Sequence, residues 1–488
     1  MERILNWING KSVAPGCDDW LEKYNPHSNV LQSQVASSTK EDVSAAITAA
    51  QDAFEKWAAL TPVRRGQILS NIVARMKDKS DALADCIAQE TGKPPQDAKG
   101  EVGGAILQGE YFAGEGMRLY ARSLTSGMPG KSSFTLRQPL GVAGLIVPAN
   151  TPIANIAWKV FPALICGNTV VLKASEDAPY TAHLFAEIAK EADLPDGVLN
   201  ILQGLGNTTG AALVQDSRIA VISFTGSTNV GRWIAEAGGK RLARVSLELG
   251  GKNPFVVCDD ADLEKAVHWA SLSAFSNAGQ RCAAASRIIV FKSIYEKFRD
   301  LLISKANSLK LGVEAGCDLG PVVSRKQMVS ILRVIENAKK EGGVVLCGGI
   351  HPDTPELING YYIQPTLIEG LSPSAELSCK EVFGPVATLY PVDNLQEALD
   401  LANATEYGLT AAIHTQSIDR AMWFAQRVCS GVANINMGTY GSEPHMPFGG
   451  FKNSGNGTRE PGVEALDVYS ELKNISFLVR DDLTTCKV

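Results

Sequence analysis

Beginning at Gly141, short β-branched runs alternate with helical patterns, and this alternation limits the fold of the chain more than any other feature. The order is GVAGLIV, a helix to Leu164, TVVLKA, a helix from Tyr180 to Ala192, and VLNILQ. AVISFTG and RVSLELGG continue the series. Strands and helices that alternate in this way indicate βαβ units. We therefore expect an α/β fold with a parallel sheet that carries helices on both faces.

Other segments flank this region. Residues 40–120 have a mainly helical pattern, with KEDVSAAITAAQDAFEKWAAL at helical spacing and a break at GKPP. A second α/β segment starts near Asn253 with PFVVCDD, continues with a helix through His268 and RIIVF, and reaches GVVLCGG. It predicts a second domain built on the same rules. The final EALDVYSELKNISFLV predicts a strand or arm that pairs outside its own domain.

Composition and charge exclude several classes of protein. With 45% hydrophobic and 20% charged residues over 488 positions, the chain is globular and long enough for two or three domains. A net charge of −6 without basic blocks argues against nucleic-acid binding, so a small molecule is the expected partner. Prolines and Lys159 interrupt the most apolar stretch, residues 141–172, well short of about 20 apolar residues. Because MERILNWINGKSVAPG contains no secretory signal, we expect a cytoplasmic protein without membrane contact.

The cysteines do not form a framework. Ten are scattered along the chain without a C-x-x-C pair, which argues against disulfides and zinc knuckles, and we expect no metal site. Most are expected to be small buried hydrophobes in a reducing compartment. Cys282 lies in FSNAGQRCAAASR, and its residue type alone leaves inert packing, disulfide, metal ligand and nucleophile open.

Three strand-to-helix turns carry groups suited to a ligand. LQGLGNTTG and SFTGSTNVG place glycines and hydroxyls at helix starts, where phosphates bind, and VVLKASE ends a buried strand with Lys173 and Glu176. Each has a plainer interpretation: a tight turn, an N-cap by Ser227 or Thr228, and a solvated loop. Together they lie at the carboxyl ends of successive parallel strands, where ligands of open α/β sheets collect.

A carboxylate in apolar surroundings is the candidate base. Glu248 in LELGGKNP lies between leucines, which would raise its pKa, although a structural ion pair explains it equally well. A base near Cys282 would supply what the thiol lacks, since an ordinary cysteine is mostly protonated at pH 7. None of the six histidines lies in a protease-like signature or in H-E-x-x-H, which argues against papain-like and zinc hydrolases.

Over nearly its whole length the chain resembles the aldehyde dehydrogenase superfamily, of the NAD(P)-dependent, non-acylating type. The resemblance is carried by LELGGK, N-x-G-Q-x-C ending at Cys282, FTGST, EVFGPV and PFGGFKNSGNG. It implies a Rossmann-type NAD-binding domain at 1–121 and 141–251, an α/β catalytic domain at 252–447, and a small β oligomerisation extension at 122–140 and 466–488. It also implies a homodimer or homotetramer.

The resemblance assigns the catalytic groups. Cys282 would be the nucleophile that forms a thiohemiacetal and then a thioester. The Asn150 amide and the Cys282 N–H would hold the oxyanion, while Glu248 would activate water for hydrolysis. Lys159 and Glu460 match positions that relay the proton onward. Gly279 is expected to bring backbone close to the reacting carbon.

The resemblance also implies an NAD site. Lys173 and Glu176 match contacts to the adenosine ribose, and Glu381 with Phe383 matches the nicotinamide ribose. A carboxylate at Glu176 favours NAD because it would repel a 2′-phosphate, although some relatives with this glutamate also accept NADP. The full set implied is Val147, Pro148, Lys173, Ser175, Glu176, Gly206, Gly210, Phe224, Thr225, Gly226, Ser227, Val230, Leu249, Gly250, Glu381 and Phe383.

Departures from the family bear on the substrate. Ala149 replaces the tryptophan of the common P-W-N, and Trp158 and Ser276 stand where well-known succinate semialdehyde dehydrogenases carry arginines. We therefore predict a neutral, apolar or aromatic aldehyde in a tunnel lined by Thr151, Asn155, Trp158, Arg281, Ala283 and the loop 437–445. Arg281 leaves a semialdehyde or other acidic substrate open. A CoA-acylating relative would typically lack the glutamate at 248, and a non-catalytic scaffold protein would not need the intact site.

Overall fold

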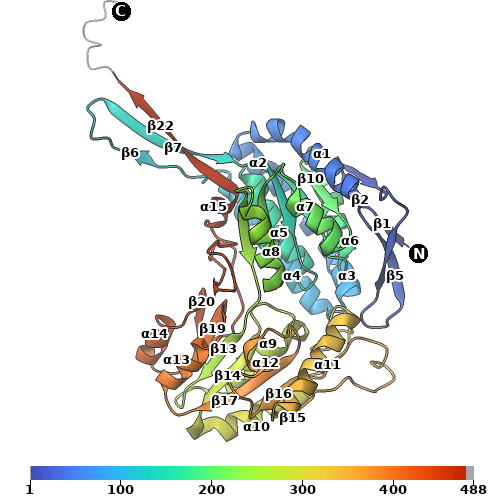
Figure 1. Cartoon of the computed structure of the whole chain (residues 1–488), viewed down its shortest axis with the longest axis vertical. Helices are drawn as coiled ribbons and strands as arrows, with labels where there is room; N and C mark the ends of the chain where they lie inside the picture. The colour runs from blue at the N-terminus through green and yellow to red at the C-terminus, as the bar shows by residue number, and fades with distance from the viewer. Residues whose placement is uncertain (1, 480–488) are drawn as a thin grey trace, which may run out of the picture.

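Two seven-stranded sheets dominate the computed structural model, which describes residues 2–479 (Figure 1). Residues 480–488, which include Cys486 and the end of the predicted extension, lie outside the described residues. In the first sheet five parallel strands are followed by two antiparallel ones. Their order is β12 (Arg244–Glu248), β11 (Ile219–Thr225), β8 (Val142–Ile146), β9 (Thr169–Lys173), β10 (Leu199–Leu202), β2 (Asn6–Ile8) and β3 (Lys11–Val13).

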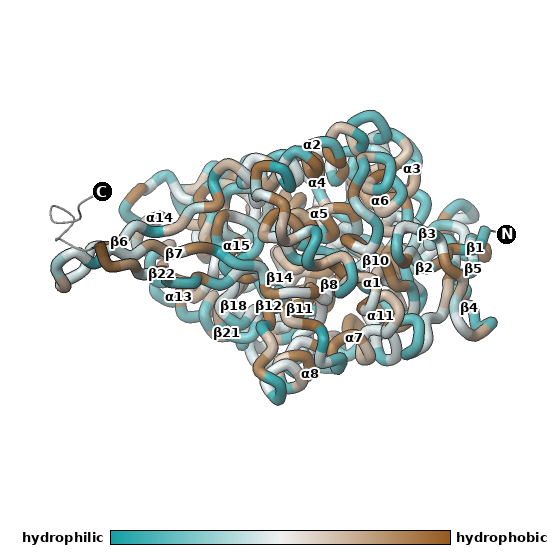
Figure 2. Tube along the Cα trace, turned by 90° about the horizontal axis from the view of Figure 1, so that it is seen from above, coloured by the Kyte–Doolittle hydropathy of each residue, from teal (hydrophilic) through white to brown (hydrophobic). Residues whose placement is uncertain are grey.

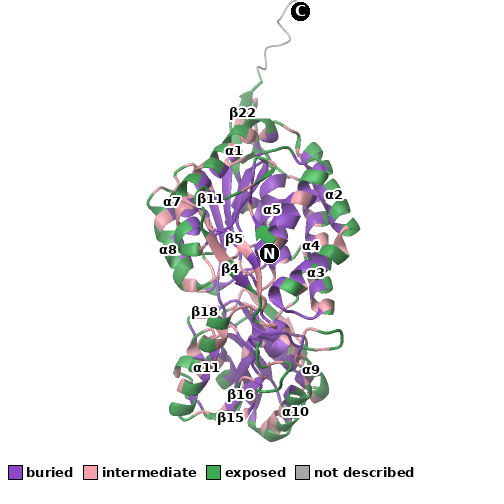
Figure 3. Ribbon diagram, turned by 90° about the vertical axis from the view of Figure 1, so that its right-hand side faces the viewer, coloured by how far each residue is buried: buried purple, intermediate pink, exposed green. Residues whose placement is uncertain are grey.

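Helices cover both faces of the first sheet, because its strands carry apolar residues on both faces. Ala143 and Leu145 of β8 face one core, whereas Val142 and Ile146 face the other. The first core is closed by α2 (Pro62–Asp78), α3 (Ser80–Thr91), α4 (Pro95–Glu115), α5 (Pro152–Ile165) and α6 (Pro179–Glu191). The second is closed by α1 (Lys40–Ala58), α7 (Ala211–Gln215) and α8 (Thr228–Gly239). The strands therefore lie buried between helices with exposed outer faces (Figure 3).

The second sheet repeats this plan. Its order is β15 (Val344–Cys347), β16 (Thr366–Glu369), β17 (Val386–Val392), β14 (Ala285–Phe291), β13 (Asn253–Val257), β19 (Thr410–His414) and β20 (Val432–Ile435), and only β15 is antiparallel to its neighbour. Cores on its faces and at its edge involve α9 (Leu263–Phe275), α10 (Tyr295–Ser308), α11 (Arg325–Lys340), α12 (Glu376–Cys379), α13 (Leu395–Asn403) and α14 (Ile418–Ala425). The α/β fold predicted from the alternation is confirmed; the residue limits of the domains stay a prediction.

Smaller sheets complete the chain. An arm projects from the body where β22 (Ser470–Leu478) pairs with β7 (Lys131–Pro139) and β6 (Ser123–Leu124), and hydrophobic segments are visible along it (Figures 1 and 2). The others are β1 (Glu2–Ile4) with β5 (Leu31–Ala36) and β4 (Trp20–Tyr24), and β18 (Tyr407–Gly408) with β21 (Phe451–Lys452). No helix within residues 2–479 has the length and apolar character needed to cross a membrane.

The C-terminal segment differs from its sequence pattern at one end. The run expected to be strand or arm begins as a short helix, α15 (Ala465–Tyr469), before β22 starts. Ala465, Leu466, Val468 and Tyr469 are all buried in the first core. A helical turn places these four side chains together on the body, which an extended strand could not do because its side chains alternate between faces.

Candidate active site

Cys282 follows a turn of strained backbone. The single turn η2 (Ser276–Gly279) connects α9 to the cysteine, and Asn277, Ala278 and Gly279 all have positive φ, at 55°, 53° and 67°. A Cβ on Gly279 would lie 2.1 Å from the Gly384 carbonyl oxygen, so only glycine fits this approach. Gly279 therefore packs against the loop that carries Glu381. Its expected closeness to the reacting carbon stays a prediction. Left-handed conformations at residues other than glycine cluster where function demands them.

The backbone around Cys282 is fixed on both sides. The Asn253 side chain donates to the Cys282 carbonyl at 2.8 Å, and the Thr439 hydroxyl donates to the Ala283 carbonyl at 2.6 Å. A Cβ on Gly251 would lie 2.5 Å from the Cys282 carbonyl. Cys282 thus lies in an anchored turn that precedes β14, and it is half-buried.

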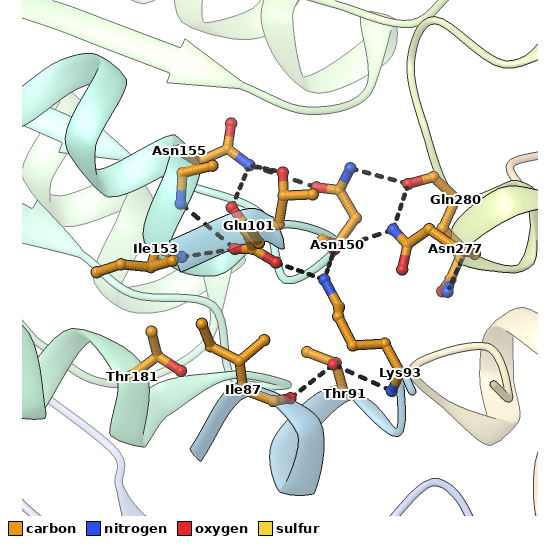
Figure 4. A network of polar contacts seen from close by, with 12 residues as sticks. Ile87, Thr91, Lys93, Glu101, Asn150, Ile153, Asn155, Thr181, Asn277 and Gln280 are labelled. Atoms are coloured by element: carbon orange, nitrogen blue, oxygen red, sulfur yellow. Dashed lines mark hydrogen bonds and ion pairs between the residues drawn. The ribbon is translucent and has the colours of Figure 1, made fainter. Parts of the chain in front are cut away.

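Asn150 lies against the same segment. It is in the loop between β8 and α5, and its amide Nδ2 donates to the Gln280 carbonyl at 2.9 Å (Figure 4). Its own carbonyl accepts from Asn277 Nδ2 at 3.0 Å. An asparagine amide has two N–H donors, and one of them is used by Gln280. The other is free to donate to an oxyanion formed beside Cys282.

The Cys282 thiol is protonated in these surroundings. Burial, followed by the carboxylates of Glu381 and Glu248, raises its pKa to about 12, against a lowering by Arg281. A thiol reacts as the thiolate, so a base has to accept its proton before it can attack.

Glu248 is a buried carboxyl group without hydrogen bonds. It ends β12 with only 4% of its surface exposed, and neither side-chain oxygen has a partner within the described residues. Burial raises its pKa well above the usual value, the charge of Glu460 raises it further, and Lys159 opposes both. Of the two interpretations, the structural ion pair is absent from the described chain. The unpaired carboxyl group suits proton transfer instead.

Lys159 and Glu460 form a buried ion pair beside Glu248. Lys159 Nζ lies 2.8 Å from Glu460 Oε2, and both side chains are at most 1% exposed. Glu460 Oε1 accepts from the hydroxyls of Ser223, Ser246 and Tyr469 at 2.8, 2.9 and 3.2 Å. These hydroxyls were missed in the sequence, where nothing linked β11, β12 and α15. They satisfy the charges, as a buried pair requires.

Lys173 and Glu176 meet at the end of β9. Their charged groups are 2.8 Å apart, and although burial opposes it, the Lys173 ammonium lowers the pKa of Glu176. The carboxylate is therefore ionised and can accept hydrogen bonds from hydroxyls. Val147 and Pro148 follow the neighbouring strand β8, with Val147 N–H donating to the Lys173 carbonyl, and the Ser175 hydroxyl accepts from Asp177 N–H.

The two glycine-bearing turns lie at the next strand ends. Gly206 and Gly210 bound a single π-helical turn, η1, and no atom lies within 4 Å of a Cβ built on either. Ser227 is the N-cap residue of α8 but makes no capping hydrogen bond through its side chain. The Ser227 hydroxyl is therefore available to bond to a ligand. The other residues expected here lie on β11, in its turn and on α8: Phe224, Thr225, Gly226 and the exposed Val230.

Glu381 rests on the turn after β12. Its carboxylate accepts from Gly251 N–H at 3.2 Å, and a Cβ on Gly250 would lie 2.2 Å from Oε2. Burial raises the pKa of Glu381 to about 7, opposed by the Gly251 N–H and by Lys252. Phe383 nearby has a φ of 56°, and Leu249 is buried under the turn. Because Gly250 and Gly251 have no side chains, the Glu381 carboxylate can lie directly against this turn.

The first turns of α5, which follow Asn150 in the chain, carry amide and aromatic side chains. The rings of Trp158 and Phe448 are 5.3 Å apart and nearly perpendicular. Asn155 donates to the carbonyl and hydroxyl oxygens of Thr151 at 2.9 and 2.8 Å. Ala149, where the family commonly has tryptophan, is buried. Thr151, Asn155 and Trp158 were predicted to line the substrate tunnel, and this stays a prediction.

Arg281 is held from two sides. Its Nε donates to the Ser276 hydroxyl at 3.2 Å, and its guanidinium lies 4.8 Å from the centre of the Tyr440 ring, in the loop 437–445. Within residues 2–479 no carboxylate forms an ion pair with it. The Arg281 guanidinium, next to Cys282 in the chain, therefore keeps N–H donors that could bind a carboxylate of the substrate.

Sequence and structure comparisons place this site in a known family. The sequence profile described as "Aldehyde dehydrogenase family" matches residues 14–475. The chain belongs to the aldehyde dehydrogenase family. It is 38% identical to the α-ketoglutaric semialdehyde dehydrogenase of Bacillus subtilis (strain 168), over 96% of this chain and 97% of that protein.

Solved structures of aldehyde dehydrogenases share the whole architecture. A putative aldehyde dehydrogenase from Burkholderia cenocepacia superposes with a TM-score of 0.96 at 35% identity, over 99% of both chains. A betaine aldehyde dehydrogenase from Staphylococcus aureus, in complex with NAD+, gives 0.95 at 34% identity, over 97% of this chain and 94% of that one. The predicted aldehyde dehydrogenase fold is therefore confirmed.

The part of the chain that the structure describes shows no grouping of three or more residues suited to a metal ion. Its nine cysteines are free thiols.

Proposed function

We propose that this protein oxidises an aldehyde to the carboxylic acid, with NAD as the electron acceptor. The observation that carries the proposal is the hydrogen bond from Asn150 Nδ2 to the carbonyl of Gln280, two residues before Cys282, which leaves the second N–H of the amide free to donate. A nucleophile with a fixed donor for a developing oxyanion is the arrangement that acyl chemistry requires.

The chain's own groups account for the steps. Glu248 takes the proton of the Cys282 thiol and passes it to the Lys159–Glu460 pair. The thiolate then forms a C–S bond to the carbonyl carbon, and the π electrons move onto oxygen, where Asn150 Nδ2 and the Cys282 N–H donate. When bound, NAD accepts the hydride lost from the thiohemiacetal. Glu248 takes a proton from water, and the resulting hydroxide attacks the thioester carbon. The C–S bond then breaks, which releases the carboxylic acid and restores the Cys282 thiolate. Lys159 and Glu460 pass that proton onward through their buried pair.

The residues present fit NAD. Glu176 is an ionised carboxylate at a strand end, the Ser227 hydroxyl is unused by its helix, and Gly206 and Gly210 leave their backbone uncovered. Together with Glu381 on its glycine turn, they would hold two riboses and a pyrophosphate. The relative from S. aureus was solved with NAD+. The carboxylate of Glu176 favours NAD over NADP because a 2′-phosphate would be repelled.

A neutral apolar or aromatic aldehyde is the first candidate substrate. Trp158 of α5 and Phe448 form a pair that supplies aromatic surface. Apolar and aromatic walls with few polar groups are typical of sites for such ligands.

A semialdehyde is the second candidate. Arg281 favours it because the guanidinium neighbours Cys282 without a carboxylate partner in the described chain, and the B. subtilis relative is named for an acidic aldehyde. Replacing Arg281 with methionine decides between them. If the variant loses kcat/KM only for aldehydes that carry a carboxylate, the semialdehyde is supported. If its kcat/KM matches that of the native protein for both classes, the neutral substrate is supported.

The test of the reaction class is NADH formation across a panel of aldehydes, with and without coenzyme A. We expect carboxylate and NADH in equal amounts, no acyl-CoA, and a preference for NAD. Cys282→Ala should abolish turnover. Full turnover by that variant, or acyl-CoA as the product, would contradict the proposal, and a panel without activity would favour a non-catalytic scaffold.

A further inference from the structure

A buried ion pair lies behind Asn150 and has no part in the chemistry above. Lys93, in the loop before α4, pairs with Glu101 on α4, and each side chain is only 4% exposed (Figure 4). Burying two opposite charges costs desolvation that their attraction barely offsets, so stability alone is a weak reason for such a pair. Its hydrogen bonds point to a different role.

Both charged groups form hydrogen bonds to the backbone of residues 150–154. Lys93 Nζ donates to the Asn150 carbonyl at 2.9 Å. Glu101 Oε1 accepts from the N–H groups of Ile153 and Ala154, at 3.0 and 3.3 Å, in the first turn of α5. Thr151, the N-cap residue of α5, makes no capping hydrogen bond through its side chain. Glu101 therefore performs the capping that the helix lacks, on the side that follows Asn150.

The anchors converge with those of the nucleophile. The Asn150 carbonyl that accepts from Lys93 also accepts from Asn277, in the strained turn before Cys282. The Asn150 side chain in turn donates to Gln280. Lys93 thus holds the Asn150 carbonyl from the helical layer, while Glu101 holds the helix start that follows it (Figure 4). From the Cys282 segment, Asn277 binds the same carbonyl and Gln280 binds the Asn150 amide.

We propose that Lys93 and Glu101 are positioning residues that hold the Asn150 amide at the place where the oxyanion develops. The inference rests on the proposed function, since it assigns the pair to the oxyanion donor of that reaction. A donor stabilises a transition state only if it is already aimed when charge appears, and a misplacement of about 1 Å can cost about 10²-fold in rate.

The first experiment is a double-mutant comparison of kcat. Asn150→Ala should lose about 10²–10³-fold in kcat, the cost of one oxyanion donor. Lys93→Met and Glu101→Gln should each lower kcat about 10–100-fold, as loss of an orienting partner does. In the variant Lys93→Met/Asn150→Ala, the loss should equal that of Asn150→Ala alone, because nothing remains to be positioned. Losses that multiply would overturn the inference.

Two readouts separate positioning from general damage. Lys93→Met should leave the Kd of NAD+ and the rate of Cys282 alkylation by iodoacetamide unchanged, since neither needs the Asn150 donor. The matched control is Lys77→Met, which should keep full activity. Lys77 of α2 forms an exposed ion pair with Glu110, which lies on α4 as Glu101 does. A fall in NAD+ affinity or thiol reactivity that parallels the loss of kcat contradicts positioning.

Folding is controlled by removing both charges. Lys93→Met leaves Glu101 buried and unpaired, whereas Lys93→Met/Glu101→Gln leaves no buried charge and should recover the melting temperature. We expect kcat to stay low in this stable variant because the anchors on residues 150 and 153 are altered. Full recovery of kcat together with stability would show a merely structural pair. If Asn150→Ala itself kept full activity, the proposed oxyanion donor would fail, which is a different result from normal activity in Lys93→Met alone.

Discussion

At the scale of single residues, the site is defined by three acidic groups whose pKa values are raised. Glu248, Cys282 and Glu381 all hold protons more tightly than they would in water, and burial is the first cause for each. Perturbed groups gathered at one place are typical of catalytic centres. Glu248 and Glu381 each give a property of the reaction that can be measured.

Replacing Glu248 with glutamine should separate the two halves of the reaction. The amide cannot accept a proton from water, so thioester hydrolysis should slow by about 10²–10⁴-fold, the usual contribution of a general base. Rapid mixing with saturating aldehyde and NAD should then show a burst of about one NADH per active site, followed by a slow steady rate. A variant that turns over at the native steady rate would remove Glu248 from hydrolysis.

The pKa of Glu381, raised to about 7 by burial, predicts a pH dependence of NAD binding. Below pH 7 the carboxyl group is protonated, and above it the carboxylate is charged and accepts hydrogen bonds from ribose hydroxyls more strongly. The Kd of NAD should therefore rise as the pH falls from 8 to 6. Calorimetry across this range checks the expectation, and Glu381→Gln should bind more weakly at pH 8 and show a flatter profile.

At the scale of elements, the site depends on turns where two chain segments approach closely. The loop of Glu381 meets η2 at Gly279, and the turn after β12 admits Glu381 at Gly250. These contacts connect the carboxyl end of the first sheet to the start of β14 and β17. Substitutions at such glycines test them directly.

Gly279→Ala should be destabilising and impair catalysis. The new Cβ would lie 2.1 Å from a backbone oxygen, at a positive φ of 67°. We expect a loss of stability of about 1–3 kcal/mol or more, since strain of this type costs that amount. The control is Gly100→Ala in α4, where no atom lies within 4 Å of the Cβ, and where about 0.5–1 kcal/mol of stabilisation is expected. Thermal melts of both variants give the comparison.

The sequence predicted the elements well and the polar networks poorly. Strand and helix order follows from local patterns, so the segments from GVAGLIV to RVSLELGG were found as β8 to β12. N-x-G-Q-x-C pointed to Cys282, but the roles of Asn277 and Gln280 in holding Asn150 depend on tertiary contacts 127 and 130 residues apart. Lys93 was interpreted only as part of a helix break. Its partner Glu101 lies on an otherwise ordinary helix, and no local pattern joins either to Asn150.

At the scale of the whole molecule, the arm is the part whose exposed surface calls for a partner. Phe134 and Leu136 of β7 pair with Ile475 and Lys473 of β22, and paired residues of an antiparallel ladder share one face. Phe134 and Leu136 are 37% and 41% exposed, and Phe477, two residues beyond Ile475, is 49% exposed. We propose that this face lies in the contact between subunits of a homodimer or homotetramer.

Charged residues on the arm should therefore dissociate the assembly. In Leu136→Asp/Phe477→Asp, two carboxylates would have to be buried without partners, which costs far more than the apolar contact gains. Light scattering coupled to size exclusion should show native particles at a multiple of 52.0 kDa and variant particles at 52.0 kDa. The matched control is Lys473→Asp on the same face, which exchanges one charge for another and removes no apolar surface. Because neither position touches Cys282 or its anchors, the thiol should keep its alkylation rate in the monomer, and a native protein that is already monomeric would refute the proposed contact.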